Sequence, residues 1–133
     1  MAIYRDFAID FLPDTNTGDL RVVEDDAAVA QSVKILVLTA LYERPFQPSV
    51  GSVVWRLLFE PLDNVTEVIL AESIKDVITT FEPRATVKEI TIYRDVDDKG
   101  RQLDPNEIVV TIAFLIANRP NLVTTSISLR RLR

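Results

Sequence analysis

Glu82, Pro83 and Arg84 place a carboxylate and a guanidinium two residues apart, on either side of a proline. An arginine offers a planar fork of donors and a carboxylate accepts them, so these side chains can pair with each other or with a partner. Considered alone, the residues favour a helix end with a surface ion pair over a binding site, because such pairs are common on protein surfaces.

Catalysis by paired carboxylates is the other chemistry that the sequence offers. Glycosidases use one carboxyl group as an acid and a second as a base or nucleophile. Glu43, Glu60 and Glu82 lie beside turn-rich segments and could converge. The chain has 20 acidic residues, so such a trio arises readily by chance, and surface charge or ion pairing is the default for each member. A peptidoglycan-degrading glycosidase is therefore kept as the alternative function.

The composition excludes most other catalytic chemistry. The 133 residues include no Cys, which removes disulfides and thiolate nucleophiles, and no His, which removes the commonest general base and metal ligand. No glycine-rich phosphate-binding loop is present either. The sequence accordingly predicts no catalytic residue, no metal and no cofactor.

The net charge of −5 is unevenly spread along the chain. Residues 1–26 hold two Arg against seven acids, whereas residues 108–133 hold four Arg and no acid. A short arginine cluster on an acidic protein argues against nucleic acid and favours an acidic protein surface as the partner. The longest apolar stretch, 108–117, is too short to span a bilayer, and no signal peptide opens the chain, so we expect no membrane partner.

Two elements of opposite periodicity position the Glu82–Arg84 corner. Helical spacing of apolar residues predicts a helix that runs from Asn64, its expected cap, to residue 81. Pro83 ends that helix, because a proline removes a backbone donor and pushes the preceding residue out of the α region. Alternating residues then predict a strand over 86–94, so the corner is a rigid helix-to-strand junction.

Earlier in the chain, alternation predicts a β-hairpin over 6–23 with a long turn and a half-buried first strand. A helix over 27–41 follows, capped by one of the two aspartates at 25–26, and its apolar stripe is expected in the core. A turn-rich segment then leads to a short helix over 53–59, which Ser52 is expected to cap.

The last third of the chain predicts a sheet. A polar loop over 95–106 separates the strand at 86–94 from a strand at 107–117, which is apolar on both faces and should therefore be central. A final strand is expected at 122–129. The fold class is α+β, with an N-terminal β-hairpin, three helices and a C-terminal three-stranded antiparallel sheet in one domain that spans residues 1–133.

Three motifs in this order resemble the baseplate wedge and sheath-initiator family of contractile phage tails. They are Glu-Arg-Pro-Phe-Gln-Pro-Ser-Val-Gly at 43–51, Leu-Leu-Phe-Glu-Pro at 57–61 and Phe-Glu-Pro-Arg at 81–84. Type VI secretion baseplates and related injection particles carry a similar subunit. The chain departs from the family at Tyr42, where Gly is frequent, and matches it fully at the Glu-Pro-Arg corner.

The resemblance implies a structural role without enzymatic activity, although some members carry a tail-lysozyme label. Family members contact the core helical bundle of the baseplate wedge through the Glu-Pro-Arg corner, resemble the inner domain of the sheath subunit, and template the first sheath ring. The implied setting is a virion tail baseplate or injection-particle baseplate, with multiple copies in a symmetric particle that assembles in the bacterial cytoplasm.

The final strand suits an edge that another chain joins, because residues 122–129 contain no charge and no proline. We expect extended arms of sheath subunits to add strands there, steered by the arginines that follow. The residues expected to bind partners are Glu43, Arg44, Glu82, Pro83, Arg84, Thr125, Ile127, Leu129, Arg130, Arg131 and Arg133.

Overall fold

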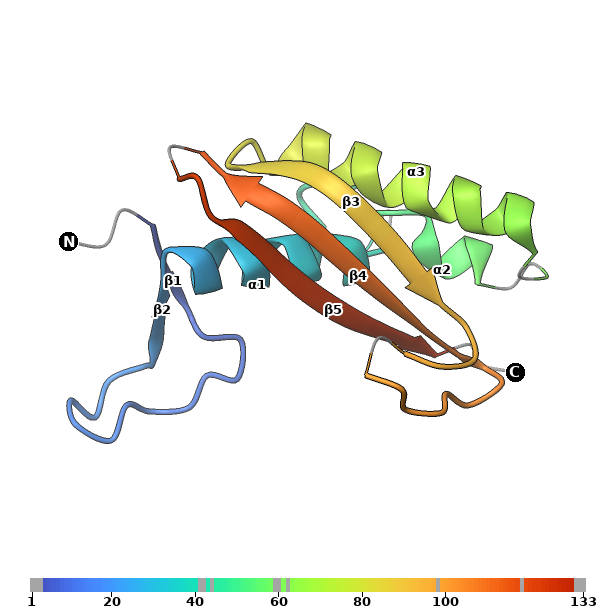
Figure 1. The fold of residues 1–133 in the computed structure, drawn as a ribbon. Helices are drawn as coiled ribbons and strands as arrows, with labels where there is room; N and C mark the ends of the chain where they lie inside the picture. The colour runs from blue at the N-terminus through green and yellow to red at the C-terminus, as the bar shows by residue number, and fades with distance from the viewer. Residues whose placement is uncertain are drawn as a thin grey trace.

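The computed structural model describes residues 4–40, 43, 45–58, 61, 63–97, 99–117 and 119–130. Across these residues the chain forms a two-stranded antiparallel sheet, three helices and a three-stranded antiparallel sheet, which confirms the predicted α+β class (Figure 1). The elements are β1 (Arg5–Phe7), β2 (Val22–Glu24), α1 (Asp26–Leu38), α2 (Val54–Leu57), α3 (Asn64–Phe81), β3 (Ala85–Tyr93), β4 (Glu107–Ile116) and β5 (Leu122–Arg130).

The three-stranded sheet has the order β3-β4-β5, so the strand that is apolar on both faces is central, as predicted. Helix α3 packs on β3 and α1 packs on β5, and Figure 1 shows both helices on the same face of the sheet. The β4 side chains on that face are all buried: they are Ile108, Val110, Ile112, Phe114 and Ile116.

The two long helices close the core from the other side. The predicted apolar stripe of α1 is buried at Val29, Val33, Leu36 and Val37. Burying each such side chain stabilises the fold by about 1.5–3 kcal/mol, so this helix–sheet layer supplies most of the stability. No helix among the described residues has both the length and the apolarity that crossing a bilayer requires.

The structure corrects two predicted helix caps. Asp63 rather than Asn64 caps α3, because its Oδ1 accepts a hydrogen bond of 2.8 Å from the backbone N–H of Thr66. Ser52 does not cap α2: its hydroxyl is buried and donates to the carbonyl oxygen of Val37 at 2.8 Å. In α3 the cap is therefore one residue earlier than predicted, and in α2 the cap position belongs to Val53, which makes no side-chain capping bond.

The N-terminal hairpin forms as predicted, but its first strand is not half-buried. Phe7, Ile9 and Phe11 are 56%, 60% and 65% exposed. Only the small Ala8, which is 2% exposed, is buried there. The alternating pattern predicted an inner apolar face, whereas in the structure the large apolar residues lie on the outside of the hairpin.

Candidate docking site

The corner forms because the α3 hydrogen-bond ladder stops at Glu82, whose N–H donates to the carbonyl oxygen of Ile78 at 2.9 Å. Pro83 has no N–H and ends the helix. The N–H of Ala85, the first residue of β3, then donates to the carbonyl oxygen of Glu82 at 3.2 Å. The helix and the strand therefore meet in a turn that is fixed from both sides, as the sequence predicted.

Glu82 and Arg84 form a two-point ion pair across this turn. Arg84 Nε lies 2.7 Å from Glu82 Oε1, and Arg84 Nη2 lies 2.9 Å from Glu82 Oε2. The hydroxyl of Ser32 on α1 also donates to Glu82 Oε2. The pairing is confirmed, but its expected surface position is wrong for Glu82, which is only 3% exposed because α1 covers it. The Arg84 side chain remains 32% exposed.

The hydrogen bonds decide the protonation state of Glu82. Burial opposes ionisation of this carboxyl group, but the bonds from Arg84 and Ser32 outweigh burial and hold the pKa of Glu82 below its ordinary value. The same pairing raises the pKa of Arg84 above its ordinary value. Glu82 is consequently a fixed carboxylate and is poorly suited to act as the general acid of a glycosidase, which needs a raised pKa.

Several distant segments meet at the corner. The Arg84 guanidinium lies 5.2 Å from the centre of the Tyr4 ring, in cation–π geometry. The backbone N–H of Tyr4 donates to Asp25 Oδ1 at 3.2 Å, and Arg119 Nη2 lies 3.1 Å from Asp25 Oδ2. Asp25 occupies the cap position of α1, as predicted, but makes no capping bond of its own. No pattern in the sequence predicted a role for Arg119.

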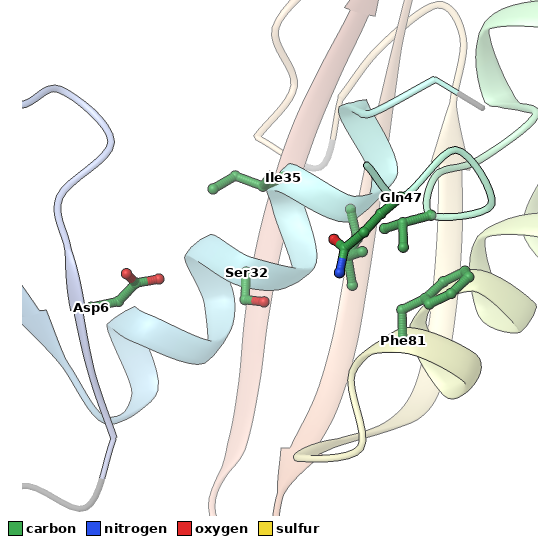
Figure 2. A pocket seen from close by; sticks show the side chains of 7 residues that line it. Asp6, Ser32, Ile35, Gln47 and Phe81 are labelled. Atoms are coloured by element: carbon green, nitrogen blue, oxygen red, sulfur yellow. The ribbon is translucent and has the colours of Figure 1, made fainter. Parts of the chain in front are cut away.

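A groove of about 360 Å³ runs beside the corner, between α1, the end of α3 and the N-terminal strand (Figure 2). Asp6 lies at one end and Phe81 at the other, with Ser32 between them. Its lining residues are Asp6, Ser32, Ile35, Leu36, Gln47, Val50 and Phe81. A groove that mixes apolar and polar lining side chains, with a carboxylate at one end, can hold an apolar side chain and a basic one.

The β5 edge is the second predicted docking site. In the described part of the chain, β5 pairs only with β4. The N–H of Ala117 donates to the carbonyl oxygen of Arg84 at 2.8 Å, so the backbone of residue 117 faces the β3 side. In an antiparallel sheet, successive residues direct their backbone groups to opposite neighbours. Odd-numbered β4 residues therefore bond to β3, and even-numbered ones bond to β5. Since Ile112 is opposite Thr125, the backbone groups of Thr125 face β4.

This alternation changes which residues offer the free edge. Like Thr125, Ile127 and Leu129 direct their backbone groups to β4, and their side chains are 1% and 0% exposed in the core. The groups that face outward belong to Thr124, Ser126 and Ser128. Of the three terminal arginines, Arg130 is exposed, and its Nη2 lies 3.6 Å from Asp104 Oδ2. Arg131 and Arg133 lie outside the described residues.

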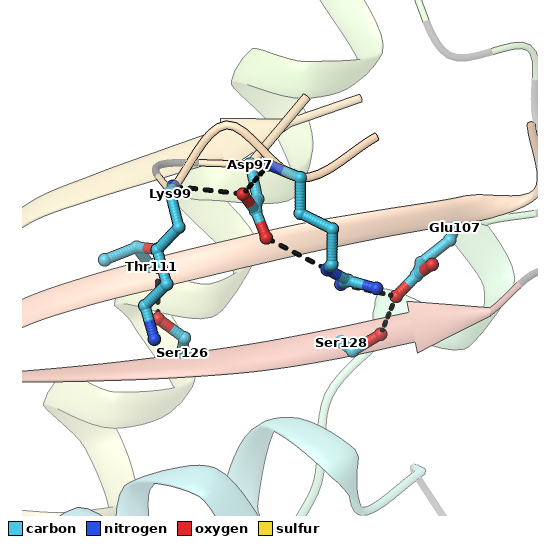
Figure 3. A network of polar contacts seen from close by, with 7 residues as sticks. Asp97, Lys99, Glu107, Thr111, Ser126 and Ser128 are labelled. Carbon is cyan, nitrogen blue, oxygen red and sulfur yellow. Dashed lines mark hydrogen bonds and ion pairs between the residues drawn. The ribbon is translucent and has the colours of Figure 1, made fainter. Parts of the chain in front are cut away.

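A polar cluster that the sequence did not predict lies on the other face of the sheet, beneath the loop over 95–106 (Figure 3). Glu107 is 4% exposed; its Oε1 accepts a bond of 2.7 Å from the hydroxyl of Ser128 and one of 3.3 Å from Arg101 Nη2. Arg101 Nε also lies 3.1 Å from Asp97 Oδ2. The Ser128 bond, opposed by burial and helped by Arg101, lowers the pKa of Glu107.

Comparison with known protein families shows to which family the chain belongs. The sequence profile of the family described as baseplate wedge protein gp25 matches residues 23–121, which is more than half of the chain. The chain belongs to this gp25 family. No curated protein sequence matches the chain. The profile covers the corner and most of the groove lining, whereas the tip of the hairpin and β5 lie outside the matched range.

Three solved structures share the fold of this gp25-family chain. A subunit of the anti-feeding prophage baseplate, solved with six-fold symmetry, has a TM-score of 0.70 and 24% identity, covering 89% of each chain. A Geobacter sulfurreducens protein provisionally named a tail lysozyme has a TM-score of 0.68 and 16% identity, covering 79% of this chain and 89% of its own. A subunit of the contracted pyocin R2 baseplate has a TM-score of 0.52 and 16% identity, covering 87% and 95%.

Among the described residues of this gp25-family chain, the predicted carboxylates Glu43 and Glu82 are each held by a separate partner. Glu43 Oε2 accepts a local bond of 2.8 Å from the N–H of Ala40, and Glu82 is held by Arg84. Arg44 and Glu60 lie outside the described residues. Within the described ranges, no group of three or more acidic residues is arranged to hold a metal ion.

Proposed function

We propose that this gp25-family chain is a structural, non-enzymatic subunit of a contractile-tail or injection-particle baseplate. It docks on core-bundle proteins of the wedge through the Glu82–Arg84 corner and templates the first sheath ring through the β5 edge. Several copies act in one symmetric particle, which is assembled in the cytoplasm of the bacterial host. Membership of the gp25 family, over a range that includes the corner, is the observation that carries the proposal.

The corner suits docking because it is organised before a partner arrives. Glu82 is locked by Ser32 and Arg84, so a partner need not order the turn, and the entropic cost of binding is lower. Its outer surface consists of the exposed Pro83, the exposed third of the Arg84 side chain and the adjoining groove. Glu82 contributes by orienting Arg84 rather than by touching the partner.

A bulky substitution at the outer surface tests the corner. Replacing Pro83 with Tyr should leave the isolated chain folded, since residue 83 is exposed, and should block its incorporation into baseplates. The matched control is Pro105→Tyr, because Pro105 is also exposed but lies in the 95–106 loop at the far end of the molecule. Equal incorporation of both folded variants would show that the corner is not the wedge contact.

The β5 edge suits strand addition because an unpaired edge of alternating N–H and C=O groups is a template for another chain. Thr124→Pro removes an outward N–H, which edge strands tolerate, and should stop sheath growth from assembled baseplates. Thr124→Ala is the control and should support growth. Thr125→Pro should instead unfold the domain, because that N–H faces β4. Normal sheaths on Thr124→Pro baseplates would exclude this edge as the template.

The arginines that follow β5 provide the electrostatic part of the same proposal. Replacing Arg130, Arg131 and Arg133 with Ser should weaken sheath growth most at low salt, because added ions screen exposed charges. A loss of growth that is independent of salt would contradict a steering role.

Purified peptidoglycan should lose no turbidity on incubation with the protein; clear activity that Glu43→Gln or Glu82→Gln abolishes would favour a glycosidase.

A further inference from the structure

The N-terminal hairpin exposes a group of large apolar side chains to solvent. Six large apolar side chains between residues 7 and 22 are 37–65% exposed: Phe7, Ile9, Phe11, Leu12, Leu20 and Val22. The corner and the β5 edge do not use them. Grouped exposed apolar residues of this kind mark surfaces that another molecule covers.

The backbone of the hairpin is held in place from its inner side. The Gln31 side chain on α1 pairs with it twice: Nε2 donates to the carbonyl oxygen of Phe7 at 2.8 Å, and Oε1 accepts from the N–H of Ile9 at 3.0 Å. Between these two residues, Ala8 is buried and its N–H donates to the carbonyl oxygen of Arg21 at 2.8 Å. The hairpin thus presents its apolar side chains outward from an anchored backbone.

Phe11 is held in a strained conformation that keeps its ring exposed. Its φ of 52° lies in the left-handed region, which bulky residues rarely adopt. Its N–H donates to the carbonyl oxygen of Ala8 at 3.1 Å, and the next N–H, of Leu12, donates to Asp10 Oδ1 at 3.2 Å. An exposed phenylalanine gains little within the fold from this strain, which points to a contact outside it.

The hairpin that carries this apolar surface has an excess of acidic residues. Residues 5–24 contain five acids and two arginines, and both arginines are already paired, Arg5 with Glu24 and Arg21 with Asp10. We propose that the hairpin docks on a neighbouring subunit that presents an apolar pocket rimmed by lysine or arginine. This surface is distinct from the corner and from the β5 edge, whose C-terminal end lies at the opposite end of the molecule (Figure 1).

The inference depends on the proposed function only because its test measures incorporation into assembled baseplates. Wild-type and Phe11→Asn chains are co-expressed with the other baseplate subunits, and their ratio in purified baseplates is measured by mass spectrometry. Asn tolerates the left-handed conformation, so thermal unfolding of the isolated variant should be unchanged or shifted upward. Its incorporation should fall roughly tenfold, because one buried phenylalanine contributes that much to affinity. Val65→Asn, at a residue 67% exposed on α3, is the control.

A second pair of variants tests the charge of the partner. Asp19→Lys should lower incorporation more at low salt than at high salt, because it opposes a basic rim. Asp76→Lys, at an exposed site on α3, should compete equally with the wild-type chain. Equal incorporation of Phe11→Asn, or insensitivity to Asp19→Lys, overturns the inference while the corner and edge experiments stand. Wild-type protein absent from baseplates would overturn both the inference and the proposed function.

Crosslinking identifies the surface that is contacted. A photoreactive phenylalanine analogue at position 11 of the full chain should crosslink, in intact baseplates, to a subunit segment flanked by lysine or arginine. The same analogue at Val65 provides the background. Crosslinks to a second copy of this chain, to an acidic segment, or no more than the background would each overturn the inference.

Discussion

Two regions of the molecule use the same three residue types around a buried glutamate. The corner triad is Ser32, Glu82 and Arg84; the edge triad is Ser128, Glu107 and Arg101. In both, the carboxylate accepts hydrogen bonds from a serine hydroxyl and an arginine guanidinium. Both glutamates are almost fully buried: Glu82 is 3% exposed and Glu107 is 4% exposed. The arginines differ: the Arg84 side chain is 32% exposed and bonds through two nitrogens at 2.7 and 2.9 Å, whereas Arg101 is 57% exposed and reaches Glu107 at 3.3 Å.

The difference follows from what surrounds each carboxylate. The corner triad ties α1 to the junction of α3 and β3, so breaking it disturbs helices that pack on the sheet. The edge triad ties the 95–106 loop to one margin of the sheet (Figure 3). Arg101 and Ser128 are exposed there, so water can replace a lost partner. Identical chemistry should therefore stabilise the whole fold at the corner and a single loop at the edge.

The largest expected effect is that of Glu82→Ala. Removing the carboxylate leaves the Ser32 hydroxyl and half of a charged pair without a partner inside the structure, which should cost about 2 kcal/mol of the free energy of unfolding. Denaturant unfolding at neutral pH measures the loss. The exposed control Glu72→Ala, also on α3, should stay within about 0.5 kcal/mol of the wild type. Equal stability of the two variants would mean that the corner triad stabilises the fold no more than an exposed glutamate does.

Acid should act on both triads with the same sign. The pKa values of Glu82 and Glu107 are held below the ordinary value of 4.5, so the stability they add is complete above that pH and is lost as pH falls through the lower folded values. The stabilities of the wild type and of Glu82→Gln, measured by urea titration, should therefore draw together as pH falls below 4.5. A constant difference between them down to pH 2 would mean that ionisation of Glu82 does not contribute.

The edge triad should affect a loop more than the whole fold. Glu107→Gln weakens the charge-assisted bond to Arg101, so the N–H groups of Leu103 and Arg101, which bond within this loop, should exchange with solvent faster. Global unfolding should change less than in Glu82→Ala. Hydrogen exchange followed by mass spectrometry separates the two readouts. Loss of global stability equal to that of the corner variant would contradict local behaviour.

The smallest expected effects come from the two serines. Ser32→Ala removes one partly buried bond to a charged group and should cost about 1 kcal/mol. Ser128→Ala should cost less, because Ser128 is exposed and water can take the place of its hydroxyl. Thermal unfolding of the two variants side by side checks the order. A reversed order would mean that the edge triad is the better shielded of the two.

The sequence by itself determined the elements and the corner. Proline chemistry ended α3 at the right residue, and the continuous apolar run of β4 predicted its central place in the sheet. The ion pair of Glu82 and Arg84 was also predictable, because residues two apart across a tight turn are close whatever the rest of the chain does. These features depend on local geometry and periodicity, which a linear sequence records directly.

Tertiary structure alone decided which of these groups are buried and which are free. Glu82 became inaccessible because α1, 50 residues earlier, crosses it with Ser32. The large residues of the hairpin stayed exposed because only Ala8 is buried there, although their alternation resembles that of a core strand. The inward direction of the Thr125 backbone groups follows from the strand register. Burial and register depend on contacts between distant segments, and no spacing within one segment encodes them.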